Sequence, residues 1–268
     1  MSIATASATY LYCVVQSARD PLRGTPSRAS REAPRRPRGL PGMGAPRALD
    51  AHGGVWVIAA SAPLDRYAGE TIDARLADLD WVSRCAVAHE ALVEHFSRES
   101  PTIPMKLFTL FTTDERALAH VTRARRRIER LFAKVAGREE WGVRMLLDER
   151  RALAPITAPA AASSGTEFLL KKKATKDARQ RLVADALAEA DRLFDALARA
   201  ADDSRRRTPA VEGPTSRMLL DAAFLVPRRA ARRFRQAATA AMRPLTDRGF
   251  EVSLTGPWPP YHFVAEEA

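Results

Sequence analysis

The histidines of this chain come closest to a catalytic or metal-binding spacing. His89 and Glu90 are followed by His95, which superficially resembles a zinc-binding H-E-x-x-H helix. That motif needs its histidines four residues apart, because side chains six apart on a helix point about 240° from each other. We therefore expect His89 to be a half-buried helix residue and His95 a solvated one, and we predict no metal site.

Other reactive side chains give no catalytic pattern either. The only cysteines, Cys13 and Cys85, form no CxxC pair or zinc spacing, so we interpret them as buried free thiols. There is no G-x-S-x-G nucleophile elbow and no glycine-rich phosphate loop. Adjacent carboxylates such as Asp202 and Asp203 are more typical of solvated charge than of an acid/base pair. We predict a protein that has no cofactor and is not an enzyme.

Arginine dominates the charge of the chain. Its 43 Lys and Arg residues against 32 Asp and Glu give a formal net charge of +11, which suggests an anionic partner. Clusters at 123–130, 205–207 and 228–235 could bind phosphate backbones. However, apolar residues occupy the complementary helix positions, and no aromatic residues interleave with the arginines to stack on bases. We favour solvated helix faces, expect nucleic acid to be an unlikely partner, and keep an Arg-rich nucleic-acid-binding protein as the alternative function.

The first half of the sequence predicts an N-terminal α+β domain over residues 1–136. Residues 10–16 and 55–61 are short apolar runs typical of neighbouring strands. The segment 17–54 between them is rich in Pro, Gly and Arg, so we expect a flexible loop. A helical region begins at Thr71, a third strand is expected at 105–111, and Thr113 precedes a helix that ends near Gly137. No apolar run is long enough for a signal peptide or a membrane span, so we expect a cytoplasmic protein.

The second half predicts a C-terminal α+β domain over residues 137–268. Its expected elements alternate, with strands at 141–148, 218–227 and 250–255 and helices at 166–201 and 228–243. The helix from 166 contains neither Pro nor Gly and is the longest in the chain. This order is compatible with a ferredoxin-like antiparallel sheet that carries its helices on one face.

Four stretches of the chain resemble the GvpL/GvpF gas vesicle family and occur in that family's order. They are Tyr10-Leu11-Tyr12, the segment 101–111 (PTIPMKLFTLF), the segment 140–144 (EWGVR) and the segment 256–263 (GPWPPYHF). The last is the most specific, and the resemblance covers nearly the whole chain except 17–54. The chain departs from the family at Lys106-Leu107-Phe108-Thr109, where many members carry Arg-Phe-Gly-Thr.

The resemblance implies two α+β domains and an accessory protein that acts without catalysis. It implies as partners the small, very hydrophobic shell protein GvpA and other accessory gas vesicle proteins, and a location at the gas vesicle. The motif residues that could contact them are Pro101, Pro104, Lys106, Phe108, Trp141, Gly142, Trp258, Pro259, Pro260, Tyr261 and Phe263. For the large rings among these we favour packing at the domain junction over contact with a client.

Overall fold

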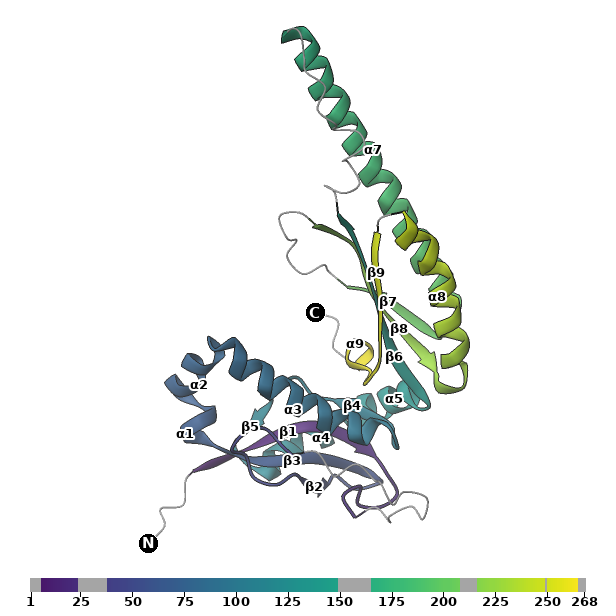
Figure 1. The fold of residues 1–268 in the computed structure, drawn as a ribbon. Helices are drawn as coiled ribbons and strands as arrows, with labels where there is room; N and C mark the ends of the chain where they lie inside the picture. Colours follow the sequence, from purple (N-terminus) through teal and green to yellow (C-terminus); the bar gives the residue numbers. More distant parts are fainter. Residues whose placement is uncertain (1–5, 24–37, 149–164, 208–215, 249, 265–268) are drawn as a thin grey trace. The chain divides into compact units, whose positions relative to one another are not determined.

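The structure, a computed structural model, describes residues 6–23, 38–148, 165–207, 216–248 and 250–264 (Figure 1). By its internal contacts the chain divides into two compact units. Unit 2 spans Arg138–Trp258, and unit 1 is formed by the chain on either side, Met1–Gly137 and Pro259–Ala268. The sequence analysis instead places the tail 259–268 in the second domain. Both units combine helices with an antiparallel sheet, which confirms the predicted α+β class.

Unit 1 is built around a five-stranded antiparallel sheet. Four strands follow the order β2-β3-β1-β4, and β5 also pairs with β1. All residues of β1 from Ala8 to Val15 are buried, as expected for a largely apolar strand in the middle of a covered sheet. The strands are β1 (Ser7–Gln16), β2 (Arg47–Asp50), β3 (Val55–Pro63), β4 (Thr102–Pro104) and β5 (Leu110–Phe111).

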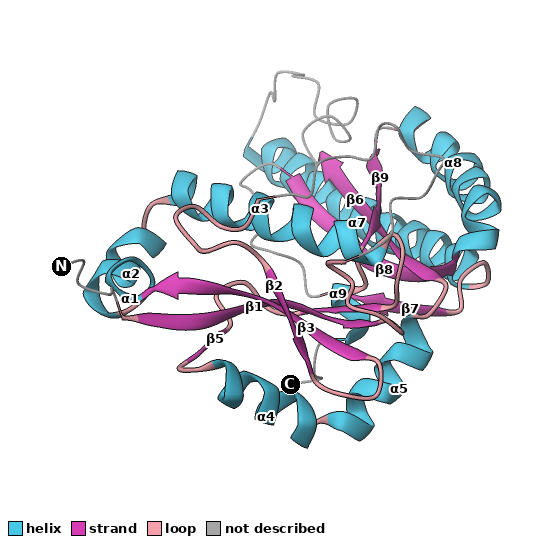
Figure 2. Ribbon diagram, turned by 90° about the horizontal axis from the view of Figure 1, so that it is seen from below, coloured by secondary structure: helices cyan, strands magenta, loops and turns pink. Residues whose placement is uncertain are grey.

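Helices cover both faces of this sheet (Figure 2). The side chains of alternate β1 residues point to opposite faces, so Tyr10 belongs to one core and Leu11 to the other. Asp78 caps the amide of Trp81 at the start of α3, and Thr113 caps that of Arg116 at the start of α4. One face carries α1 (Leu64–Tyr67), α2 (Gly69–Leu76) and α3 (Leu79–Ser97), and the other carries α4 (Asp114–Arg123) and α5 (Arg125–Val135).

The C-terminal tail completes both cores of unit 1. The short helix α9 (Tyr261–Val264) packs Tyr261 against the core below α3 and places Val264 in the core below α4 and α5. Phe263 is 1% exposed, and the ammonium group of Lys134 lies 5.4 Å from the centre of its ring. These apolar contacts explain why the tail belongs to unit 1.

Two sequence-based expectations for unit 1 are wrong. The segment 17–54 is not a single flexible loop, because β2 pairs with β3 within it and Leu40 is buried; residues 24–37 lie outside the described residues. The segment 105–111 is not one strand. A turn closed by the Thr109 amide on the Lys106 carbonyl separates β4 from β5, and Phe108 adopts a left-handed φ of 63° that a strand cannot accommodate.

Unit 2 has the predicted ferredoxin-like arrangement. Its antiparallel sheet follows the order β7-β8-β6-β9, and both long helices contribute to one core on the same face. The sequence analysis missed β7, a short polar strand at the edge of this sheet. The elements are β6 (Arg138–Asp148), α7 (Gly165–Ala198), β7 (Asp203–Arg206), β8 (Ser216–Pro227), a 3₁₀ turn (Arg228–Ala230), α8 (Ala231–Asp247) and β9 (Phe250–Trp258).

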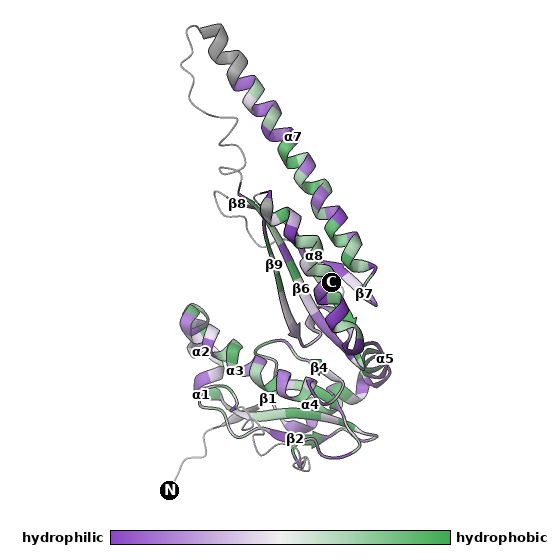
Figure 3. Cartoon of the chain, turned by 45° about the vertical axis from the view of Figure 1, so that its right-hand side comes forward, coloured by the Kyte–Doolittle hydropathy of each residue, from purple (hydrophilic) through white to green (hydrophobic). Residues whose placement is uncertain are grey.

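Aromatic rings fill the centre of the core of unit 2. The ring of Phe234 on α8 lies 5.6 Å from that of Phe224 on β8 and 6.3 Å from that of Trp141 on β6, centre to centre. Along α7, apolar residues recur at helical spacing and alternate with polar ones (Figure 3). None of the described helices is sufficiently long and apolar to cross a membrane.

Candidate functional site

The family-like motifs meet in pairs, one pair in each unit. In unit 1 the Tyr10-Leu11-Tyr12 stretch lies beside the segment 101–111, with Tyr10 opposite Leu110 and Cys13 opposite Pro104. In unit 2, β6 with its Glu-Trp-Gly stretch pairs with the end of β9. Each unit therefore brings together two motifs that are far apart in the sequence.

The contact in unit 2 explains why Gly142 stands in its motif. Gly142 lies opposite Thr255, and a β-carbon at position 142 would lie 2.8 Å from the hydroxyl oxygen of Thr255. The ladder is irregular between Glu140 and Gly142, where Trp258 pairs with Glu140. Gly142 thus leaves room for the side chain of Thr255 on the neighbouring strand.

A buried hydrogen-bonded chain connects the motifs of unit 1 through His89. The Tyr10 hydroxyl lies 2.7 Å from His89 Nδ1, and His89 Nε2 lies 3.1 Å from the carbonyl oxygen of Met105. Because a carbonyl only accepts, Nε2 carries the proton and Nδ1 accepts from Tyr10. The Tyr10 oxygen in turn accepts from the amide of Phe108 at 3.4 Å. The chain links β1, α3 and the turn after β4.

Burial controls the protonation of this chain. Burial lowers the pKa of His89 to about 4, and the hydrogen bond to Met105 offsets only part of this shift. Burial also raises the pKa of Tyr10. The histidine is therefore neutral at physiological pH. Both ring nitrogens of His89 form hydrogen bonds within the protein, so His89 stabilises the fold. At 3% exposure His89 is fully buried, not half-buried as predicted, and His95 is partly buried.

A second tyrosine and two thiols are also buried in unit 1. The Tyr12 hydroxyl accepts from the amide of Leu40 at 2.9 Å, and burial raises its pKa to about 12. Cys13 and Cys85 are both buried and free, as the sequence predicted. Burial raises the pKa of Cys13, so its thiol is protonated and unreactive at neutral pH.

The motif residues of the turn after β4 are mostly structural. Phe108 stacks on Trp81 with ring centres 5.5 Å apart and planes 2° apart, and the carbonyl of Pro101 accepts from the amide of Gln16. Pro104 is buried in β4, whereas Lys106 is exposed. Among these candidates Lys106 is the one whose side chain is accessible to a partner.

The rings of the motifs 140–144 and 256–263 divide in the same way. Trp141 is 5% exposed and lies in the core of unit 2, and Phe263 is buried in unit 1 together with Pro259 and Pro260. Tyr261 is partly buried, and Trp258 is 44% exposed. Packing thus accounts for most of these rings, and the role of any of them in binding stays a prediction.

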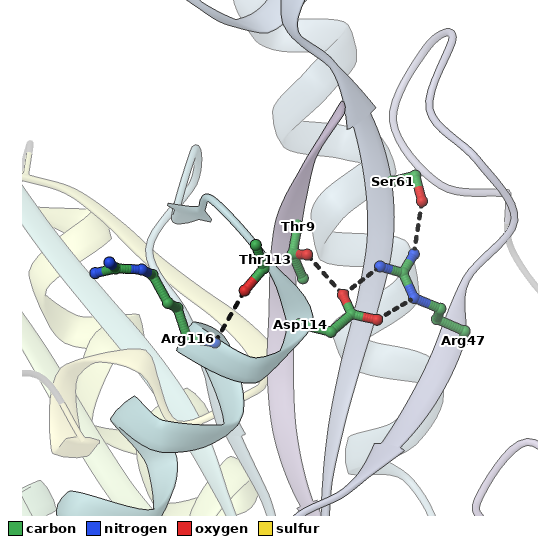
Figure 4. A network of polar contacts seen from close by, with 6 residues as sticks. All are labelled: Thr9, Arg47, Ser61, Thr113, Asp114 and Arg116. Atoms are coloured by element: carbon green, nitrogen blue, oxygen red, sulfur yellow. Dashed lines mark hydrogen bonds and ion pairs between the residues drawn. The ribbon is translucent and has the colours of Figure 1, made fainter. Parts of the chain in front are cut away.

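An ion pair that the sequence analysis missed ties the edge strand β2 to α4 (Figure 4). Arg47 donates through Nη2 to Asp114 Oδ1 at 2.5 Å and through Nε to Oδ2 at 3.2 Å, and the Thr9 hydroxyl donates to Oδ1 at 2.6 Å. Arg47 also donates to the hydroxyl of Ser61 at 3.0 Å. The Arg47 hydrogen bonds lower the pKa of Asp114, so the carboxylate is ionised.

Several arginines of the three clusters bind within the chain. Arg125 donates to the carbonyls of residues 51–53 and to Glu129, and Arg207 forms an ion pair with Asp221. Arg235 lies 5.8 Å from the centre of the Trp141 ring. These contacts support the interpretation of the clusters as parts of the folded surface.

Comparison with known proteins shows the family. The model of the gas vesicle synthesis proteins GvpL/GvpF matches residues 8–265. The chain belongs to the GvpL/GvpF family. Gas vesicle protein L of Streptomyces sp. (strain CB03234) is 31% identical over 244 residues, which cover 86% of this chain and 89% of that protein.

Two solved GvpF structures share the fold of this GvpL/GvpF chain. The structure from Anabaena sp. PCC7120 has a TM-score of 0.69 at 18% identity and covers 98% of both chains. That from Microcystis aeruginosa has a TM-score of 0.64 at 16% identity, covering 97% of this chain and 99% of its own. The family places the chain among gas vesicle proteins, as its motifs indicated.

Proposed function

We propose that this GvpL/GvpF protein promotes gas vesicle assembly in the cytoplasm by direct, non-catalytic contacts with the shell protein GvpA and with other accessory gas vesicle proteins. The family match over residues 8–265 carries the proposal. The ionisable groups of unit 1 also support it, because the buried His89 and Tyr10 and the partly buried Asp114 are used in internal hydrogen bonds.

Exposed apolar side chains of unit 1 offer a surface for a hydrophobic client. Leu76 ends α2 and Leu79 begins α3, and their side chains are 46% and 79% exposed. Val87, about two turns further along α3, is 67% exposed. Leaving such residues in water costs free energy that contact with an apolar partner would recover. We assign this α2–α3 surface, defined by Leu76, Leu79 and Val87, to GvpA.

Deleting the gene for this protein from a gas vesicle gene cluster tests the proposal. We expect cells that lack it to form no gas vesicles in electron micrographs, and a copy supplied in trans to restore them. Normal vesicles in its absence would rule out a required role in assembly.

A further inference from the structure

A hollow lies in unit 2 where α7 ends and α8 begins. It encloses about 420 Å³ and opens to solvent. Ten residues line it: Ala196, Arg199, Ala200, Ala201, Asp202, Pro227, Ala230, Arg233, Phe234 and Ala237. None of the four family-like stretches contributes to it, whereas Arg233 belongs to the arginine cluster 228–235.

The walls of this hollow are apolar and made of small side chains. Five of the ten lining residues are alanines, and Pro227 adds a larger apolar side chain. Phe234 is 1% exposed because its ring packs in the core of unit 2. Because alanine side chains are small, another chain can approach the walls closely. An apolar side chain that entered the hollow would be removed from water without losing hydrogen bonds.

The two arginines give this apolar hollow a positive rim. Arg199 and Arg233 are exposed, and no ion pair involves either of them in the part of the chain that the structure describes. The one carboxylate among the lining residues, Asp202, already pairs with Arg138 at 2.7 Å. The first turn of α8 carries no acidic residue to neutralise the arginines.

We propose that this hollow, which we call the Arg199–Arg233 hollow, binds an acidic segment of a partner protein. An apolar side chain of the segment enters between the alanines, and a neighbouring carboxylate binds the two guanidinium groups, whose fork geometry suits carboxylate oxygens. The inference rests on the proposed function, because the partner is one of the gas vesicle proteins.

The chemistry of the hollow favours a peptide over a nucleic acid. The ring of Phe234 is buried and presents no face on which a base could stack. The other lining residues between the arginines are mostly alanines, which offer no side-chain donors to base edges. A concave apolar surface with two cations at its rim instead matches an amphipathic acidic segment.

Peptide binding by the full-length protein tests the inference. The probe is an array of overlapping peptides from the gas vesicle proteins encoded alongside this chain. We expect binding to peptides that place a Leu, Ile or Phe beside an Asp or Glu. The double variant Arg199→Glu/Arg233→Glu should lower affinity at least ~10-fold, and exchanging the peptide carboxylates for lysine should restore it.

A matched control separates this site from general charge. Lys173→Glu/Arg181→Glu makes the same charge change at exposed positions of α7 away from the hollow, and we expect it to bind as the wild type does. Ala200→Trp fills the hollow without changing charge and should also abolish binding. Thermal unfolding establishes that each variant is folded, and the arginine variant alters only exposed side chains.

The outcomes distinguish the two proposals. If whole gas vesicle proteins bind equally to the wild type and to Arg199→Glu/Arg233→Glu, the inference about the hollow is wrong and the proposed function stands. If duplex DNA displaces the peptides at physiological salt, the hollow is not a peptide site. If the wild type binds no gas vesicle protein and no peptide, both proposals fail.

Discussion

In unit 1 every residue of β1 from Ala8 to Val15 is buried, because helices pack on both faces of the sheet. In unit 2 the strand β9 alternates, with Glu251, Ser253 and Thr255 exposed, because α7 and α8 share one face. The first sheet can therefore enclose ionisable groups such as the Tyr10–His89 chain. The second sheet also buries two carboxylates, Glu140 and Asp221, but the outward residues of its edge strand β9 stay exposed and available for contact.

The comparison predicts that each core stabilises its own unit. Phe132 in unit 1 and Phe224 in unit 2 are both buried. We expect Phe132→Ala and Phe224→Ala each to cost about 3–5 kcal/mol, confined to the unit that carries the change. Hydrogen exchange of the full chain measures this: Phe132→Ala should expose β1 and β3 while β6 and β8 stay protected. Equal loss in both units would contradict the division.

The second prediction concerns pH and belongs to unit 1 alone. The folded-state pKa of His89 is about 4 against an ordinary 6.5, so the unfolded chain binds the extra proton first. Stability is complete above about pH 6.5 and falls as the pH drops toward 4, by about 3 kcal/mol. Urea unfolding followed across this range measures the loss.

His89→Phe is the control for this pH dependence. It removes the titrating group, so the variant should be less stable at pH 7 but nearly independent of pH between 6.5 and 4. A variant that keeps the wild-type slope would show that another group titrates. The contribution of Asp114, whose folded pKa is depressed, is lost separately as the pH falls below its ordinary value of 3.8.

In unit 2 the corresponding sensitive point is a strand contact. Gly142→Ala places a methyl group 2.8 Å from the Thr255 hydroxyl, which should cost about 1–3 kcal/mol of stability through crowding. Adding Thr255→Ala removes the crowded oxygen, so the double variant should recover most of the loss. Chemical denaturation of the wild type, Gly142→Ala, Thr255→Ala and the double variant gives the coupling free energy. Additive effects of the two substitutions would contradict this account of the glycine.

The smallest expected effect is at the edge of the first sheet. Arg47 and Asp114 are each about one-third exposed, so their ion pair is screened by solvent. We expect a coupling free energy of about 1 kcal/mol in a double-mutant cycle of Arg47→Met and Asp114→Asn. A coupling near zero would mean that β2 is held by its backbone ladder alone.

The strands and helices with strong apolar patterns were predictable from the sequence. The runs at 10–16 and 55–61 and the long helix from 166 are elements of the structure. Two missed four-residue edge strands carry too little pattern: Asp203–Arg206 has no apolar residue, and Arg47–Asp50 has only Ala48 and Leu49 within a Pro-, Gly- and Arg-rich segment. The strand expected at 105–111 is broken because Phe108 turns the chain.

The site was predictable only in part, because its contacts are distant in sequence. The motif around Tyr10 was recognised, but its partner His89 lies 79 residues away and carries no signal of that pairing. In the sequence, Arg47 is one of many charges in an expected loop. In the structure it forms an ion pair with Asp114. The Arg199–Arg233 hollow depends on how two helix ends meet, which periodicity does not specify.

Binding of GvpA by the purified protein tests the central claim, that this chain works by contact, most directly. A tagged full-length copy is co-expressed with GvpA, and the eluate is examined by mass spectrometry. We expect GvpA to co-elute with the wild type and with Leu187→Asp, a matched change at an exposed leucine of unit 2, but not with Leu79→Asp. Absence of GvpA from folded wild-type protein would contradict the account.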